Sequence, residues 1–493
     1  MTTPACFSLS PFASADDLEG DTLHEECGVF GVYNDPDAAA HVALGLHALQ
    51  HRGQEAAGIV SFDGTQFHAA KGPGHVSENF RSDQLMTELK GRTAIGHVRY
   101  STSGGAVMRN IQPLFAEFAF GGLAIAHNGN LTNALTLRET LVNRGCLFQS
   151  TSDTEVIIHL IAISICSSVE ERIIDALRQV QGAYSIVALT NTALIGVRDP
   201  MGIRPLVLGH LDGAYLLASE TCALDIIGAE FVRDIEPGEL VVITEAGVTS
   251  QRPFAVQPSH FCVFEYIYFA RPDSVVEGRS VYDVRKAIGR ELARESNVEA
   301  DVVVPVPDSG VPSALGYAAE AGLPFEYGII RNHYVGRTFI QPTDKTRNLG
   351  VKRKHNPNRS QLEGKRVVLV DDSIVRGTTS TKIVEMVRQA GAVEVHMRIS
   401  SPPTTYPCFY GIDTPEREKL LAANYTLEDM ARLLGVDSLA FVSLEGLYRA
   451  AGCPVRDPHV PQFCDACFSG SYPIANKDRA LASAARKPIL FRD

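Results

Sequence analysis

A cysteine stands at the start of an apolar, strand-like run in the sequence HEECGVFGVY, which covers residues 24 to 33. The usual interpretation of a single cysteine there is a small buried hydrophobe at a strand end. The alternative is that the chain is cut before Cys27, so that the thiol and a new α-amino group belong to one residue. An α-amino group has a pKa of about 7.7 to 8.0 and can act as a general base near neutral pH. On this hypothesis Cys27 becomes an N-terminal nucleophile and residues 1–26 are a propeptide.

The composition favours a removable leader on a protein that stays in the cytoplasm. Residues 1–26 contain six acidic side chains and no Lys or Arg, unlike a secretory signal or an Arg-rich transit peptide. The net charge of −12 argues against nucleic acid and against a polybasic membrane anchor. The most apolar window, residues 156–168, is too short to span a bilayer. With 493 residues, the chain is long enough for two or three domains.

Four short segments of the first half carry groups suited to amide hydrolysis: QHRGQEAAG (50–58), GHVRYSTSG (96–104), AHNGNL (126–131) and SDTE (152–155). Attack by a thiolate needs an oxyanion hole and groups that hold the charges of the substrate. Asn128 offers a side-chain amide and Gly129 a backbone N–H, Arg99 offers a fork for a carboxylate, and Asp153 offers a partner for an ammonium group. Singly, an Asn-Gly pair is more often a hairpin turn and SDTE a helix start.

Together, Cys27-Gly28 and these segments closely resemble the N-terminal-nucleophile glutamine amidotransferases over residues 27–258. The resemblance implies an αββα sandwich and cleavage before the nucleophile Cys27. It also implies an oxyanion hole made by Asn128 and Gly129, and glutamine bound by Arg99 and Asp153. His51, Arg52 and Gly53 match the family motif beside the glutamine site, and Arg52 and Gly53 are expected to contribute to glutamine binding.

The second half contains a strand that ends in two acids, in GKRVVLVDDSIVRGTTS (364–380). Small hydroxyl residues and glycine between a strand and a helix can surround a phosphate with N–H groups and hydroxyls. Adjacent acids at a strand end can hold Mg²⁺ or a sugar diol. An Asp-Asp pair alone also occurs in α/β proteins of other functions.

The full segment resembles the 5-phosphoribosyl-1-pyrophosphate loop of the type I phosphoribosyltransferases. DVVVPVPDSG (301–310) matches the strand and turn that meet pyrophosphate, and residues 331–356 form a basic, glycine-interrupted segment suited to a flap. The resemblance implies Mg²⁺ held near Ser309, Asp371 and Asp372. It assigns phosphoribosyl pyrophosphate to Asp371, Asp372, Ser373, Arg376, Gly377, Thr378 and Thr379, with Arg337 and Lys354 from the flap.

Four of the ten cysteines raise a separate question. Cys464 and Cys467 form a C-x-x-C pair, which can be a redox pair, half a metal site or two ordinary thiols. Cys262 and Cys408 match cysteine positions of those bacterial-type amidotransferases acting on phosphoribosyl pyrophosphate that carry an iron–sulfur cluster. Four thiolates could hold zinc or [4Fe–4S] by ligand type alone, and the resemblance favours a structural [4Fe–4S] cluster. We expect the other cysteines, Cys6, Cys146, Cys166, Cys222 and Cys453, to be dispensable for it.

A glutaminase followed by a phosphoribosyltransferase resembles the amidotransferases that act on phosphoribosyl pyrophosphate. The implied reaction converts glutamine, water and phosphoribosyl pyrophosphate to 5-phosphoribosylamine, glutamate and pyrophosphate, the first committed step of purine synthesis. The resemblance also implies a homotetramer inhibited by purine nucleotides. The alternatives are a binding module that senses the same ligand, a sugar-phosphate isomerase or an asparagine synthetase; the last two would need another sequence at 364–380.

The elements that must position these residues follow from periodicity. Short Val/Ile/Leu-rich strands with few helices over residues 27–258 predict stacked antiparallel sheets covered by helices. Helices are expected at 37–53 and from Ser152, an N-cap with Glu155 three residues on. An α/β phosphoribosyltransferase domain is expected at 259–470, with a helix that follows the phosphate loop and closes at Gly391, and a C-terminal tail at 471–493.

Overall fold

The computed structural model describes residues 24–25, 27–81, 87–100, 108–332 and 355–478. Packing contacts divide them into two compact units. The N-terminal unit contains residues 24–285 together with 406–415 and the described residues from 451 onward, and the C-terminal unit contains 286–405 and 416–450. Two segments late in the chain therefore pack with the N-terminal unit. The domain ranges 27–258 and 259–470 stay predictions.

Two mainly antiparallel sheets form the N-terminal unit. The seven-stranded sheet has the order β12 (Glu230–Asp234), β10 (Val207–Leu211), β11 (Ala214–Ala218), β2 (Cys27–Tyr33), β5 (Thr93–Arg99), β3 (Ala56–Phe62) and β4 (Phe67–Pro73). The six-stranded sheet has the order β14 (Gly247–Gln251), β13 (Leu240–Thr244), β9 (Leu194–Arg198), β8 (Gly182–Thr190), β7 (Gly121–Leu131) and β6 (Leu114–Phe118).

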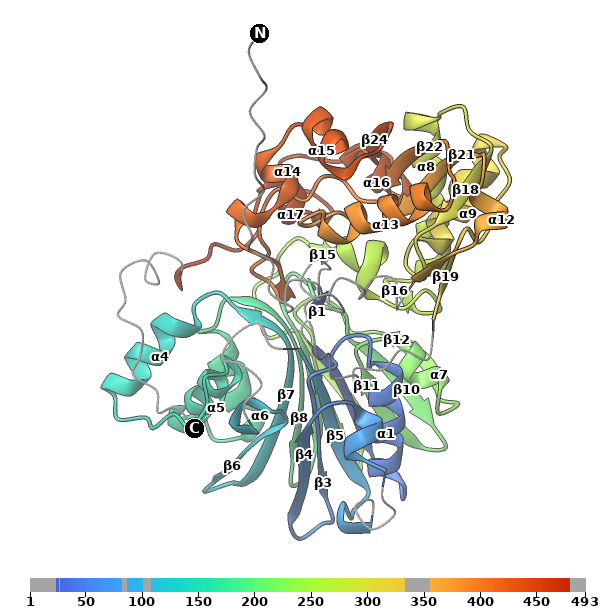
Figure 1. Ribbon diagram of the computed structural model, residues 1–493. Helices are drawn as coiled ribbons and strands as arrows, with labels where there is room; N and C mark the ends of the chain where they lie inside the picture. Colours follow the sequence, from blue (N-terminus) through green and yellow to red (C-terminus); the bar gives the residue numbers. More distant parts are fainter. Residues whose placement is uncertain (1–23, 26, 82–86, 101–107, 333–354, 479–493) are drawn as a thin grey trace, which may run out of the picture. The chain divides into compact units, whose positions relative to one another are not determined.

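The central strands are buried on both faces, because the sheets pack on each other and carry helices outside. All nine residues of β8 and all seven of β5 are buried. One apolar core joins Val29 and Ile95 of one sheet to Ala126 of the other. Helices α1 (Ala38–Ala48) and α7 (Cys222–Asp225) cover the seven-stranded sheet, and α4 (Ala134–Asn143), α5 (Thr154–Ile163) and α6 (Val169–Leu177) cover the six-stranded one (Figure 1). The predicted αββα sandwich is confirmed.

The C-terminal unit is built on a four-stranded parallel sheet. Its strands are β18 (Val302–Pro305), β21 (Arg366–Asp371), β22 (Glu394–Ile399) and β24 (Ser438–Phe441), in that order. Helices α9 (Val311–Ala321), α13 (Thr378–Gln389) and α15 (Leu427–Leu434) follow successive strands, as parallel crossovers require. The expected α/β fold of the second half is confirmed.

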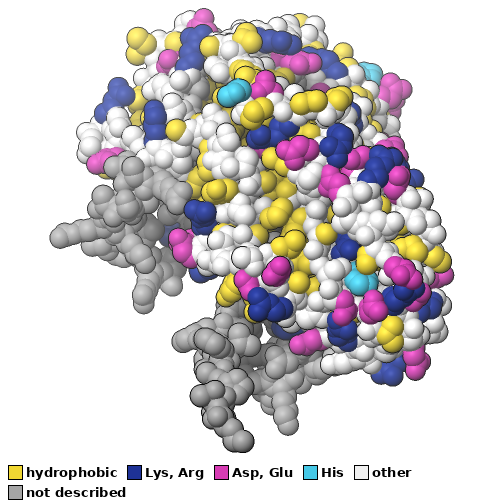
Figure 2. Space-filling model, turned by 90° about the horizontal axis from the view of Figure 1, so that it is seen from above, with side chains coloured by type: hydrophobic (Ala, Val, Ile, Leu, Met, Phe, Trp, Pro, Cys, Tyr) yellow, Lys and Arg dark blue, Asp and Glu magenta, His cyan; other side chains and the backbone are white. Residues whose placement is uncertain are grey.

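The described surface is mixed in charge. Figure 2 shows positive and negative side chains interspersed over the face that it displays. Among the described residues, no helix has both the length and the apolar character needed to cross a bilayer.

Candidate active sites

Cys27 is the first residue of β2 and lies directly opposite Arg99 in the antiparallel pair of β2 and β5. Both side chains are buried, at 6% and 5% exposure. Val29 and Ile95 belong to the core between the two sheets. Because side chains alternate along a strand, Cys27 and Arg99 point toward that same layer. The thiol and the guanidinium therefore share one end of the inter-sheet space.

Asn128 reaches this layer from the opposite sheet. It lies inside β7, two residues after Ala126, which belongs to the same core. Its side chain is fully buried, and within the described residues neither its amide nitrogen nor its oxygen has a hydrogen-bond partner. An unpaired buried amide is costly, which fits a group whose partner is a substrate.

Gly129 follows with a φ of +138°, and a Cβ there would come 2.1 Å from the carbonyl oxygen of Ala183. Only glycine fits this position. The Asn-Gly pair is thus part of a strand and not the hairpin turn that it more often forms.

Asp153 is held next to the same strand. It is the N-cap of α5, yet its side chain makes no cap hydrogen bond. Its Oδ2 instead accepts from the backbone N–H of Leu131 at 3.0 Å. The N-cap lies one residue after the predicted Ser152, although the Ser152 hydroxyl still accepts from the Thr154 N–H at 3.3 Å. Glu155 does not complete a capping box, because its carboxylate accepts from the backbone N–H groups of Gln149 and Ser150.

The motif residues 51–53 pack next to β5, the strand that carries Arg99. Arg52 is fully buried and pairs with Glu220 and, at 2.6 Å, with Glu265. His51 Nε2 lies 2.7 Å from Glu220 Oε1. Burial alone would raise the pKa of Glu220, but Arg52 and His51 hold it well below its usual range. A Cβ on Gly53 would meet the backbone nitrogen of Arg99 at 2.6 Å.

Arg52 and Gly53 therefore brace the turn against β5, and a direct glutamine contact by either stays a prediction. Sequence reasoning did not single out Glu220 or Glu265. Glu265 could have been found, because it is the lone acid in the aromatic run CVFEYIYFA. A charge that is buried in such a run must be paired, which predicts a basic partner.

In the C-terminal unit, β21 ends on the predicted acid pair. Asp371 and Asp372 are each 7% exposed, and the Asp371 carboxylate accepts from the Asp372 N–H at 2.9 Å. Ser373 Oγ donates to Asp372 Oδ2 at 2.6 Å. Residues 373–377 form the loop, Gly377 adopts a φ of +84°, and α13 begins at Thr378. This places Thr378 and Thr379 in the first turn of a helix, the end at which helices bind phosphate groups.

Ser309 lies in the turn after β18, the neighbour of β21. A Cβ on the adjacent Gly310 would come 2.4 Å from the carbonyl oxygen of Val370, so this turn closes against the end of β21. The carboxyl ends of parallel strands meet at one edge, and the structure brings Ser309 to the edge that carries Asp371. Arg376 lies in the same loop, whereas Arg337 and Lys354 lie outside the described residues.

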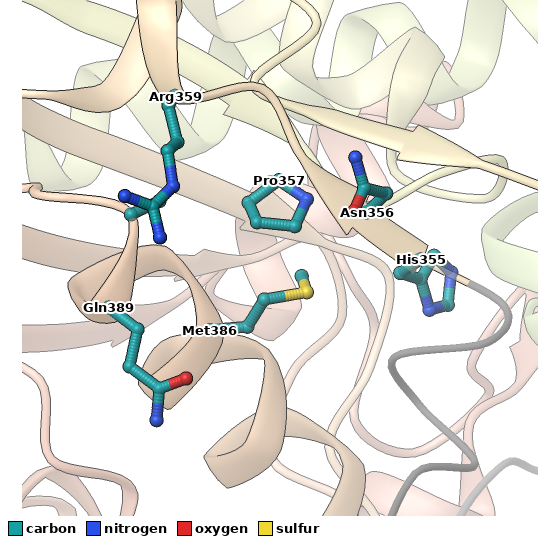
Figure 3. Close-up of a pocket in the computed structure, with 7 residues that line it drawn as sticks. His355, Asn356, Pro357, Arg359, Met386 and Gln389 are labelled. Atoms are coloured by element: carbon teal, nitrogen blue, oxygen red, sulfur yellow. The ribbon is translucent and has the colours of Figure 1, made fainter.

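A cavity of about 400 Å³ lies elsewhere in this unit (Figure 3). It is lined by residues of β20 (His355–Pro357) and by the C-terminal end of α13, including Met386 and Gln389. The phosphate loop is at the other end of that helix, about 16 Å away along its axis. This cavity is therefore not the predicted phosphate site.

The four singled-out cysteines meet in the N-terminal unit. Cys262 and Cys464 are paired residues of the two-stranded parallel sheet of β15 (Phe261–Cys262) and β25 (Phe463–Cys464). Cys467 lies on α17 (Ala466–Ser469), and its carbonyl oxygen accepts from the N–H of Tyr406, two residues before Cys408.

Burial, together with Glu265 and Cys408, raises the pKa of Cys262 to about 12. Burial, with Cys262 and Cys408, raises the pKa of Cys464 well above the usual range, and burial with the other three thiols does the same for Cys467. The four sulfurs thus lie within electrostatic reach of one another. Among the described residues, no three or more His, Cys, Asp or Glu side chains form a group that could hold a metal ion.

Comparison with known proteins agrees with both halves. A glutamine amidotransferase domain model matches residues 97–225 and a phosphoribosyl transferase domain model matches 277–400. An amidophosphoribosyltransferase of Rhizobium etli is 59% identical over 97% of both chains. The chain belongs to the amidophosphoribosyltransferase family. A chloroplastic amidophosphoribosyltransferase of Arabidopsis thaliana is 52% identical over 95% of this chain and 82% of its own.

A solved amidophosphoribosyltransferase structure extends the match to three dimensions. The glutamine phosphoribosylpyrophosphate amidotransferase of Bacillus subtilis, solved with ADP and GMP, aligns with a TM-score of 0.87. It is 48% identical and covers 91% of this chain and 98% of its own. The family catalyses the first step of purine biosynthesis, and its glutaminase and phosphoribosyltransferase parts account for the two sites described above.

Proposed function

We propose that Cys27 releases ammonia from glutamine and that the Asp371–Asp372 edge holds the phosphoribosyl pyrophosphate that captures it. The observation that carries the glutaminase assignment is the convergence of three buried groups. The Cys27 thiol, the Arg99 guanidinium and the unpartnered Asn128 amide face one layer from two sheets.

The first half-reaction uses the thiolate as nucleophile. Cleavage before Cys27 frees an α-amino group, which takes the thiol proton. Sulfur then attacks the side-chain carbonyl carbon of glutamine, and the Asn128 amide and the Gly129 N–H stabilise the oxyanion. The α-ammonium group returns the proton to the leaving nitrogen, so collapse expels ammonia and leaves a glutamyl thioester, which water hydrolyses to glutamate. Arg99 binds the α-carboxylate of glutamine and Asp153 its ammonium group.

The second half-reaction takes place at the carboxyl edge of the parallel sheet. The loop from Ser373 to Thr379 holds the 5′-phosphate through N–H groups and hydroxyls, and Arg376 adds a positive charge. Asp371, Asp372 and Ser309 offer the oxygen donors that suit Mg²⁺, which when bound assists departure of pyrophosphate. Neutral ammonia attacks ribose C1, so it must reach this edge without being protonated in bulk water.

The four cysteines are proposed to bind a structural [4Fe–4S] cluster. Four thiolates could hold zinc or a [4Fe–4S] cluster by ligand type alone. The electrostatic influence of the four thiols on one another supports one shared site. The resemblance to cluster-bearing relatives favours [4Fe–4S] over zinc.

Further properties are proposed on family grounds. Removal of residues 1–26 is required by the role of Cys27. The nucleotides in the Bacillus subtilis structure support inhibition by purine nucleotides. A homotetramer and a cytoplasmic location complete the proposal.

The test follows glutamate release and phosphoribosylamine formation with glutamine or ammonia as nitrogen source. We expect phosphoribosyl pyrophosphate to stimulate glutamate release and both nitrogen sources to give product. A chain that binds phosphoribosyl pyrophosphate but turns over neither source would support a sensing module and contradict the proposal.

A further inference from the structure

A segment from late in the chain lies directly on the strand that carries the oxyanion hole. Residues 406–415 belong to the N-terminal unit. The side-chain amide of Asn130 donates to the carbonyl oxygen of Phe409 at 3.0 Å. Asn130 is two residues after Asn128 in β7, so the contact is made at the site itself.

Gly411 makes the closest approach. It adopts a φ of +106°, and a Cβ at this position would come 2.9 Å from the Cα and 3.1 Å from the carbonyl carbon of Gly129. These are backbone atoms of the glycine whose N–H is assigned to the oxyanion. Any side chain at residue 411 must push either the segment or Gly129 away.

The segment is anchored on its other side and has little room to retreat. Arg204, which is fully buried, donates from Nη2 to the carbonyl oxygen of Gly411 at 3.3 Å. Tyr410 donates its hydroxyl to the carbonyl oxygen of Ile474 at 2.6 Å. Within the segment, the Cys408 N–H donates to Thr414 Oγ1 at 2.6 Å, which holds its turn together. Displacement at Gly411 should therefore be transmitted to β7.

We propose that Gly411 and Asn130 are positioning residues that fix the oxyanion hole of the glutaminase site. The proposal rests on the roles proposed above for Asn128 and Gly129. An oxyanion donor must lie 2.7–3.1 Å from the developing charge, and a misplacement of about 1 Å can cost a hundredfold in rate. Arg99 and Asp153, which are proposed to bind glutamine, come from β5 and from the start of α5 and not from β7. A shift of Gly129 should thus lower kcat more than it raises KM.

The test compares Gly411→Ala with Gly247→Ala. Gly247 also has a φ of +106°, but nothing lies within 4 Å of its added Cβ, so the pair shares the backbone strain and differs in the collision. For Gly411→Ala we expect kcat with glutamine to fall at least about tenfold, with KM for glutamine changed less than about twofold. Ammonia-dependent synthesis and the rate of Cys27 alkylation by iodoacetamide should match those of Gly247→Ala.

A second variant, Asn130→Asp, replaces the donor that faces Phe409 by an acceptor of the same size and should show the same kcat loss. Equal kcat values for Gly411→Ala and Gly247→Ala, or an equal loss with both nitrogen sources, would overturn the positioning role. Full glutamine use by a Cys27→Ala variant would instead overturn the proposed function.

Discussion

Two features position the side chains of the glutaminase site: the alternation of side chains along its strands, and the buried ion pairs next to it. Cys27 and Arg99 share a face because they are opposite residues of one antiparallel pair. Behind them, Arg52 bridges Glu220 and Glu265 with every side chain fully buried. A buried charge that loses its partner is strongly destabilising, so this network holds the turn at residues 51–53 in one arrangement.

Replacing Glu220 by Gln tests this network. The pKa of Glu220 is lowered in the folded protein. Its charge therefore adds stability that is fully present above the unfolded pKa of about 4.3, and this stability is lost as the pH falls through the folded value. We expect Glu220→Gln to cost about 3 to 5 kcal/mol at pH 7. Thermal unfolding should show a lower Tm for Glu220→Gln than for the parent at pH 7, and this Tm difference should shrink below about pH 4.

Glu230→Gln, at an exposed position of the same unit, serves as the control and should change Tm little. A Glu220→Gln protein that melts with the parent at pH 7 would contradict the bracing role.

At the scale of elements, the strand, loop and helix at 366–389 carry the residues proposed for phosphoribosyl transfer. Changing Asp371 and Asp372 together to Asn should stop product formation with either nitrogen source, because both reactions share the ribosyl centre. The fold should survive, since neither carboxylate is needed in the apolar core around β21. Side-by-side assays and circular dichroism check this, with Glu385→Gln on the exposed face of α13 as the matched control.

Sequence reasoning predicted the elements where periodicity and local contacts dominate. The αββα layers and the strand that ends on Asp371 follow from buried runs and their termini. The cap of α5 lies one residue after the predicted Ser152, and the Asp153 carboxylate accepts from the N–H of Leu131, 22 residues away, and not from its own helix. Gly411 contacts Gly129 although 282 positions separate them in the sequence. No local sequence pattern predicts such a contact.

At the scale of the whole molecule, the cysteine site ties together distant parts of the N-terminal unit. Its proposed ligands are residues 262, 408, 464 and 467. The chain beyond them reaches Asp478, which accepts from the N–H groups of Leu135 and Thr136 at the start of α4. We expect a brown protein with about four iron and four sulfide per chain. Cys464→Ser should lose iron and stability, whereas Cys453→Ser should keep both. Stoichiometric zinc in a colourless active enzyme would show the assignment to be wrong.

The proposed removal of residues 1–26 is tested on the whole chain. Intact-mass measurement of the active enzyme should show loss of residues 1–26, because only a free α-amino group on Cys27 can serve as the base. A fully active preparation that retains Met1 is incompatible with this mechanism.

The most direct measurement is the ratio of glutamine-dependent to ammonia-dependent phosphoribosylamine formation in Cys27→Ala, with Cys146→Ala as a control, a partly buried cysteine packed against the helices of the six-stranded sheet. On the proposed mechanism the thiolate serves only the release of ammonia, so the ratio should fall to background for Cys27→Ala while the ammonia-dependent rate stays near that of the parent. Cys146→Ala should keep the parental ratio. Persistence of glutamine-dependent synthesis in Cys27→Ala, or loss of both activities in a folded protein, would contradict the division of the reaction between the two sites.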